Sequence, residues 1–182
     1  MQRHPWRRLA AWCVDWLCIL GWVALVAAVT VPVVLARRGT LDPTGDLLTE
    51  NLLAFVITIA PVTAVLAVLE SRGATVGKRV LRIRVRAAAA SLGAAPSLGA
   101  APSLGAAALR NVVKVAVPWS LGHAAVFSLA QSPAAVAPWV VPVLVAAYVL
   151  PLASVAALFV RRGRTPYDWL CRTDVVRVDA RE

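Results

Sequence analysis

The stretch Arg8-Leu-Ala-Ala-Trp-Cys-Val-Asp15 runs directly into the apolar segment 16–36, and the two together decide the fold. An apolar run of this length is typical of a helix that crosses a membrane. Arg8 and Asp15 are seven positions apart, so on an α-helix they lie on nearly the same face, about 10 Å apart along the axis. The long arginine can extend its charge to the headgroup region, whereas the short aspartate cannot. A carboxyl group at that depth is costly unless it faces other helices, water or a cation, so we expect other spans to pack around this one.

The composition is that of a membrane protein with several spans. Of the 182 residues, 60% are hydrophobic and only 15% are charged, yet the formal net charge is +10. The basic residues lie between apolar segments, where the positive-inside rule and anionic lipid place them. We therefore expect a lipid bilayer with anionic headgroups as a partner, and no nucleic acid.

Catalytic and metal-binding patterns are not found in the sequence. Cys13, Cys18 and Cys171 have neither CxxC nor Cys/His spacing, so we expect unpaired thiols and no metal site. There is no paired-carboxylate cleft and no nucleophile beside a base. We expect a protein that is not an enzyme, with no catalytic residue and no cofactor.

Four apolar segments predict four transmembrane helices, at about residues 9–36, 52–69, 109–130 and 134–160. In the second, Pro61 predicts a kink, with freed carbonyl groups that accept hydrogen bonds from Thr58 and Thr63. Three prolines predict a bend in the fourth: Pro138, Pro142 and Pro151. The predicted fold class is therefore all-α and transmembrane, a four-helix polytopic bundle.

The basic loop 71–108 and the tail 161–182 predict a small β element. Between residues 81 and 86, arginines alternate with apolar side chains, which is the pattern of an amphipathic strand. Three valines between residues 175 and 178 predict a second strand that pairs with the first. Within the loop, residues 91–107 read SLGAAP twice and then SLGAA, which we interpret as a low-complexity insertion. The chain, 1–182, is then a single membrane domain.

The distribution of charge predicts the orientation. The amino terminus, the region 71–114 and the tail are basic, whereas the loop 37–51 has a net negative charge and the turn 131–135 has none. Four spans with both termini in the cytoplasm satisfy the positive-inside rule throughout. Three spans would put the basic loop or the basic tail outside. We expect a multi-pass protein of the inner (plasma) membrane whose β element is cytoplasmic.

Four motifs, in the same order, resemble those of the RDD family of bacterial membrane proteins, which is named for an arginine and two aspartates. The segment 8–15 looks like the motif of the first helix. Gly73-Ala-Thr-Val-Gly-Lys-Arg-Val-Leu81 resembles the basic stretch after the second helix. Leu109-Arg-Asn111 resembles the "LRN" that opens the next helix. Arg164-Thr-Pro-Tyr-Asp-Trp-Leu170, followed by Thr173-Asp-Val-Val176, is similar to the closing element.

The resemblance covers nearly the whole chain except residues 91–107. It implies that Arg8, Asp15 and Asp168 are the name-giving residues. The chain departs from the family pattern at Tyr167, where His is frequent, and at Cys171-Arg172, where small residues are commoner. Some members have been proposed as cation/proton antiporters, so the resemblance implies a location and a fold better than an activity.

The motif residues predict a charged cluster on the cytoplasmic face, formed by Arg8, Asp15, Lys78, Arg79, Arg110 and Asp168. Asp15 is either a cation or proton site, or a structural carboxylate paired with Arg110 or Lys114. We favour the second, because a buried charge in a membrane usually finds a partner. Asp168 either joins Asp15 or, as we favour, ties the tail to Lys78 or Arg79.

Two functions remain open. One is a small cation/proton transporter that uses Asp15 and, deeper in the bundle, His123. A lone histidine more often hydrogen-bonds a neighbour than relays protons. The other is an accessory or interaction subunit of a membrane complex, with other membrane proteins or a second copy as partner. The short chain, the absence of inverted repeats and the lack of carboxylates at mid-depth favour this second function.

Overall fold

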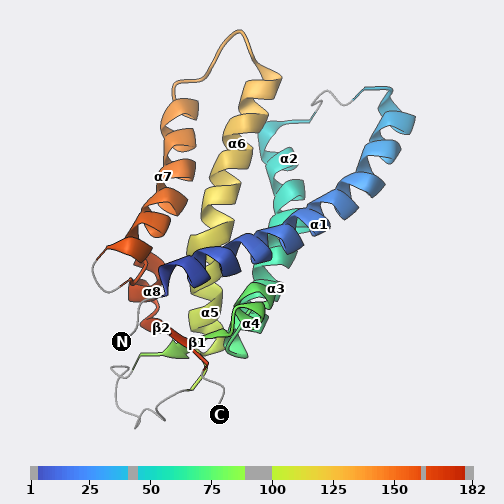
Figure 1. Cartoon of the computed structure of the whole chain (residues 1–182). Helices are drawn as coiled ribbons and strands as arrows, with labels where there is room; N and C mark the ends of the chain where they lie inside the picture. Colours follow the sequence, from blue (N-terminus) through green and yellow to red (C-terminus); the bar gives the residue numbers. More distant parts are fainter. Residues whose placement is uncertain (1–3, 41–44, 89–99, 161–162, 179–182) are drawn as a thin grey trace.

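The structure is a computed structural model that describes residues 4–40, 45–88, 100–160 and 163–178. Within these residues four helices are long and apolar enough to cross a membrane: Pro5–Arg38, Leu47–Val80, Leu104–Gln131 and Val140–Phe159. The predicted number of spans is confirmed. The first span is α1 (Pro5–Arg38) and the fourth is α7 (Val140–Phe159). Figure 1 shows α1 crossing obliquely over the other spans, which run closer to parallel.

The second and third spans are each interrupted by a π-helical segment. Within Leu47–Val80, the second span is built from α2 (Leu47–Ala54), η1 (Phe55–Ile59) and α3 (Ala60–Ser71), and the short helix α4 (Val76–Val80) follows after a turn. The third consists of α5 (Leu104–Asn111), η2 (Val112–Ala116) and α6 (Val117–Gln131). Each π segment ends two residues before a proline, Pro61 or Pro118. Proline has no N–H to continue the helical ladder, and a wider turn accommodates the missing bond. The hydroxyl of Thr63 donates to the carbonyl of Ile59 at 2.7 Å, four residues back, whereas the carbonyl that Pro61 frees is that of Ile57, so the predicted threonine partner of the freed carbonyl stays a prediction.

The fourth span begins later than the sequence predicts, which changes the role of two of its prolines. The helix α7 begins at Val140, so Pro138 precedes it and Pro142 falls in its first turn, and only Pro151 lies inside the helix. A proline in the first turn replaces an N–H that would have no helical acceptor. The prediction that all three prolines bend this span was therefore wrong for Pro138 and Pro142.

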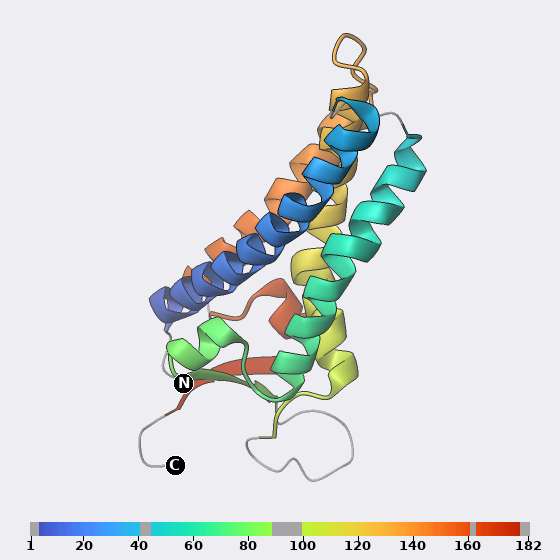
Figure 2. The ribbon, with the colours of Figure 1, turned by 90° about the vertical axis from the view of Figure 1, so that its right-hand side faces the viewer.

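The end of the bundle that carries the small sheet is called the sheet end below. It contains α4 (Val76–Val80), β1 (Ile83–Ala87), α8 (Pro166–Leu170) and β2 (Thr173–Arg177). Figures 1 and 2 show the sheet beneath the helices, with the start of α1 on this side as well. The strands are antiparallel, with Val85 opposite Val175. Ile83 and Val85 are buried, whereas Arg84 is exposed, so the predicted amphipathic strand and its pairing are confirmed.

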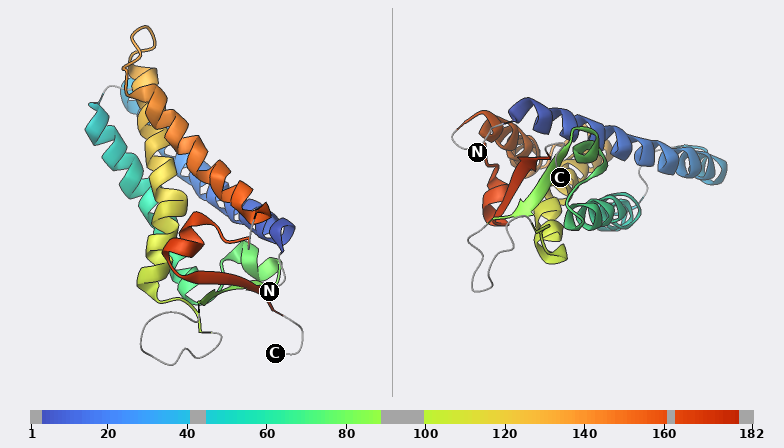
Figure 3. Two further views of the ribbon diagram at one scale, coloured as in Figure 1. Left: turned by 90° about the vertical axis from the view of Figure 1, so that its left-hand side faces the viewer. Right: turned by 60° about the horizontal axis from the view of Figure 1, so that its bottom comes forward.

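The two halves of the sheet end repeat one local design, 90 positions apart. In each, a threonine precedes a five-residue helix, a two-residue turn follows, and a five-residue strand begins. The second turn residue is an arginine with positive φ in both, Arg82 at 53° and Arg172 at 48°. Figure 3 shows the two strands crossing under the spans side by side. The sheet therefore joins the first half of the chain to the second.

The last unit of the repeat begins a helix. Residues 89–99 lie outside the described residues, but the unit that starts at Ser103 forms the first turn of α5, and the Ser103 hydroxyl accepts from the Ala106 N–H at 3.2 Å. The earlier two units end in proline, whereas this one continues into Ala108, so its helix is not blocked. The interpretation of 91–107 as a loop insertion was wrong for this unit, and the third span begins at Leu104.

The first span is longer than a bilayer core. Its 34 residues extend about 51 Å, against roughly 30 Å of hydrocarbon. Strongly exposed apolar side chains recur along α1 from Leu17 onward, whereas Ala11 and Asp15 are buried at the sheet end. One face of α1 therefore packs on protein, at Ala11 and Asp15 against α4 and at Ile19 in the apolar core, and much of the rest, including Trp6, presents an apolar surface.

Candidate functional site

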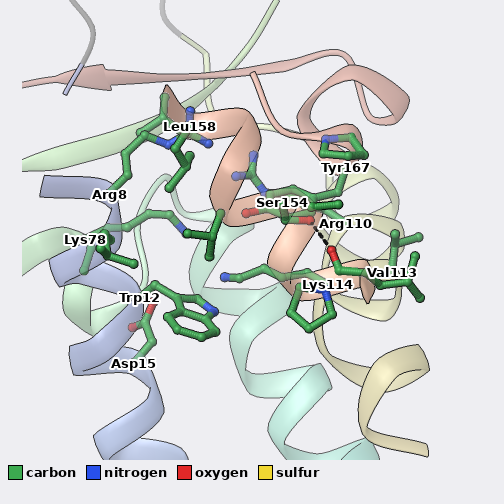
Figure 4. Close-up of a pocket in the computed structure, with 18 of the residues that line it drawn as sticks. Arg8, Trp12, Asp15, Lys78, Arg110, Val113, Lys114, Ser154, Leu158 and Tyr167 are labelled. Carbon is green, nitrogen blue, oxygen red and sulfur yellow. Dashed lines mark hydrogen bonds between the residues drawn. The ribbon is translucent and has the colours of Figure 1, made fainter. Parts of the chain in front are cut away.

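Six ionisable side chains from five segments meet at the sheet end and are called the charged cluster below: Arg8, Glu70, Lys78, Arg110, Lys114 and Asp168. They come from all of the spans except α7, and from α4 and α8. Their side chains are between 0% and 14% exposed. Figure 4 shows four of them around the cavity that the cluster borders.

Glu70, at the end of α3, holds one half of the charged cluster and is fully buried. Lys78 forms a hydrogen-bonded ion pair with its Oε1 atom. Its Oε2 atom lies 3.2 Å from Nε of Arg110 and accepts a hydrogen bond from the Asn111 amide at 3.0 Å. A buried carboxylate with this many donors is stabilised in its charged form.

Asp168, in α8, holds the other half. Its carboxylate forms ion pairs with Arg8 and with Arg110, the latter at 2.7 Å, and it accepts from the Thr165 N–H in a capping box. Burial raises the pKa of Asp168, but attraction to Arg110 and Arg8 outweighs it and holds the pKa below its usual value. The predicted partners were Lys78 and Arg79, and that prediction was wrong. The capping turn of α8 directs Asp168 to α1 and α5 instead.

Arg110 connects the two halves of the charged cluster. Besides Glu70 and Asp168, its guanidinium donates to the Thr173 hydroxyl at 2.7 Å and lies 5.1 Å from the centre of the Tyr167 ring. Planar guanidinium groups combine several donors with a stacking face, which suits this position. Burial raises the pKa of the Tyr167 phenol, so this residue stays protonated at neutral pH. The third span, the second span and the tail are thereby held at one point.

Asp15 is buried but is bound by neutral donors rather than by cations. Its carboxylate accepts from the Thr75 hydroxyl at 2.7 Å and from the Gly77 N–H at 2.8 Å. The expected pairing with Arg110 or Lys114 was wrong, because the first turn of α4 lies against α1 and supplies these donors. The approach is close: a Cβ atom at Gly77 would lie 2.0 Å from the Ala11 carbonyl oxygen. Asp15 thus fixes α4 to α1.

Two predicted site residues lie apart from the others. Arg79 is exposed and has no ion pair among the described residues. The His123 ring hydrogen-bonds Asn51 at 3.0 Å and stacks on Phe127. His123 is nine positions beyond Lys114 on the same span, about 13 Å along the axis. His123 and Asp15 have no hydrogen-bond partner in common among the described residues, and these residues hold no group of three or more His, Cys, Asp or Glu side chains that could bind a metal ion.

Sequence reasoning missed Glu70 and Asn111. Glu70 reads as the polar end of an apolar segment, yet it is the acid that binds most of the cluster. The sequence did contain an indication of Glu70. The basic residues in the motifs outnumber the carboxylates in the motifs, so a further acid was required to balance their charge. Asn111 forms part of the "LRN" motif, but its hydrogen bond to Glu70 depends on how the third helix is rotated.

The comparison with protein families agrees with this architecture. A family model described as the RDD family matches residues 3–132, which is more than half of the chain. The chain belongs to the RDD family. RDD proteins are membrane proteins, as the four apolar spans indicate. The matched range includes Arg8, Asp15, Lys78 and Arg110, whereas Asp168 lies beyond it. Neither the curated proteins nor the solved structures gave a match.

Proposed function

We propose that this RDD protein is a non-enzymatic accessory subunit of a plasma-membrane complex, with its sheet end in the cytoplasm. The observation that carries the proposal is that the buried carboxylates are already bound by groups of the protein. Asp15, Glu70 and Asp168 are all bound by donors of the protein itself. They hold three spans, α4 and the tail in one arrangement, which suits a fixed platform better than a pathway for ions.

The outer surface of the sheet end supports an interaction role. Several of its arginines are exposed, here called the arginine surface: Arg72, Arg79, Arg82, Arg84 and Arg172. The described acid on β2, Asp174, already forms an ion pair with Arg164. A surface that carries only positive charges attracts an acidic partner. Basic residues beside the spans also favour the cytoplasmic side, so the arginine surface supports a cytoplasmic location for both termini.

A photo-crosslinking residue in place of Arg84 tests the accessory role in intact cells. The control position is Val136, which is 48% exposed in the turn at the opposite end. We expect one protein to be crosslinked repeatedly from position 84 but not from position 136. It should co-purify in a constant ratio in two mild detergents, and Arg84→Glu should weaken its retention. A protein that purifies alone, with crosslinks to lipid only, would refute the proposal.

Transport of a cation or proton past Asp15 is the alternative that this experiment does not address. It requires the carboxylate to exchange Thr75 and Gly77 for an ion, and among the described residues no ion pair or hydrogen bond connects Asp15 with His123. In everted vesicles, the accessory role predicts that Asp15→Asn leaves cation-driven proton flux unchanged. A flux that is present with the natural chain and lost with Asp15→Asn would favour the transporter instead.

A further inference from the structure

A cavity of about 110 Å³ lies where the sheet end meets the spans. It borders the inner side of α1, the side of α7 between Leu150 and Leu158, and the charged cluster. Figure 4 shows Lys78 and Lys114 reaching toward its centre from opposite sides, with Trp12 and Asp15 of α1 beside them. A single buried water needs about 10–15 Å³ of such space, so the cavity has room for a polyatomic group.

The charges that line this cavity are unbalanced. Its wall includes four cations, Arg8, Lys78, Arg110 and Lys114, and among the described residues one carboxylate, Asp15. Asp15 cannot offset them fully, because it supplies one negative charge against four positive ones, and even with Glu70 and Asp168 counted the four cations face three carboxylates. Glu70 and Asp168 lie behind the wall and are shared among all four cations. The cavity therefore has an excess of positive charge.

Lys114 is the cation whose charge is least compensated. Its side chain is 8% exposed, and its nearest acidic atom, Oε1 of Glu70, is 3.9 Å away. That same oxygen is already the acceptor of Lys78. Within the described part of the chain, the Lys114 ammonium makes no hydrogen bond. Lys114 lies in the π-helical segment η2, and such segments often redirect a side chain at functional sites. An ammonium that borders a cavity and has no acceptor in the protein is left to a ligand or to water for its hydrogen bonds.

We infer that this cavity binds an oxyanion of the phosphate type. Such a group offers several acceptor oxygens at once, and ammonium and guanidinium donors bind it with short, charge-assisted hydrogen bonds. A metal cation or an amine would be repelled by the four cations of the wall. Lys78, Arg110 and Lys114 all line the cavity, so two ammonium groups and one guanidinium border one space.

The same cavity has an apolar side, which bears on the source of the anion. Leu150, Pro151, Val155 and Leu158 of α7 line it opposite the charged cluster. A phosphodiester headgroup with its acyl chains along α7 would satisfy both sides, and so would a free phosphate that occupies the polar side alone. The two sources share the chemistry of the bound group and differ in the need for apolar chains.

The test uses the full chain, purified and delipidated in a neutral detergent. Its melting temperature is followed during titration with inorganic phosphate, with short-chain phosphatidylglycerol and, as a control, with phosphatidylcholine. The variant Lys114→Met removes the uncompensated ammonium. The variant Arg79→Gln removes one positive charge from the exposed surface at the same end and serves as the matched control.

We expect phosphate or phosphatidylglycerol to raise the melting temperature, and Lys114→Met to weaken that binding by about ten- to hundredfold. Arg79→Gln should bind as the natural chain does. A response to phosphatidylglycerol alone identifies a lipid headgroup, and a response to phosphate identifies a free anion. Without added anion, Lys114→Met should melt higher than the natural chain, because it removes the excess positive charge of the cavity. A purely structural lysine predicts the opposite sign.

Three results would overturn the inference. Neither anion stabilises the natural chain, or Lys114→Met binds as tightly as the natural chain, or Arg79→Gln weakens binding to the same degree. Lys114→Gln keeps a polar side chain and allows the same comparison if the methionine variant does not fold. The measurement uses the purified protein alone, so it is independent of whether a protein partner binds the arginine surface.

Discussion

Gly77→Ala should separate α4 from α1. The added Cβ atom would lie 2.0 Å from the carbonyl oxygen of Ala11 and 3.0 Å from Oδ1 of Asp15, where contacts under 3.0 Å essentially do not occur. The backbones must therefore move apart by about 1 Å or more. Overpacking of this kind costs about 1–3 kcal/mol, and the shift also weakens the hydrogen bond from Gly77 to Asp15, worth about 1.5–3 kcal/mol.

Because the two effects overlap, we expect Gly77→Ala to lower the free energy of unfolding by about 2–5 kcal/mol. The melting temperature in mild detergent, followed by size-exclusion chromatography after heating, measures this change. The matched control is Gly105→Ala in α5, where a Cβ atom meets nothing within 4 Å. There alanine should stabilise the helix by about 0.5–1 kcal/mol. If both variants melt at or above the natural temperature, the close contact between α1 and α4 does not exist.

Other perturbations test the charged cluster and the start of the third span. Glu70→Gln leaves several buried cations without their shared carboxylate and should cost about 3–5 kcal/mol, seen as lost folded yield, whereas Glu50→Gln on the half-buried part of α2 should not. The pKa of Asp168 is lowered in the folded state, so its contribution is complete above its unfolded pKa of about 4 and is lost as the pH falls below that. Melting temperatures between pH 5 and pH 3 should fall more steeply for the natural chain than for Asp168→Asn, and parallel curves would contradict this. Ala108→Pro should cost about 3 kcal/mol by interrupting α5, whereas Leu104→Pro at its first position should be tolerated.

The features that depend on local pattern were predictable from the sequence. Apolar length alone predicts four spans, and the alternation of arginines with apolar residues predicts β1. The start of the third span was also readable: the third repeat unit lacks the proline that ends the first two. Its serine is then a helix cap rather than a loop residue.

Partners within the charged cluster were not predictable in the same way. The pairing of carboxylates with cations depends on how each span is rotated about its axis. It also depends on how the chain turns after α3 so that α4 packs against α1. Asp15 illustrates this, since its donors come from Thr75 and Gly77, a hydroxyl and a backbone amide that no charge pattern marks. The excess of basic motif residues indicated that an acid was missing, but only the packing identifies it as Glu70.

The ion pair between Arg8 and Asp168 joins residues 160 positions apart, and this separation has a consequence for biogenesis. At about 5–20 residues per second, the ribosome makes the arginine roughly 8–32 s before its aspartate. During that interval the first span is already in the membrane, with a guanidinium that lacks its final counterion. The bundle cannot lock from its amino-terminal half alone. Ribosomes that stall before α8 leave a first span that α4 already holds through Asp15, but whose arginine still lacks its partner on α8.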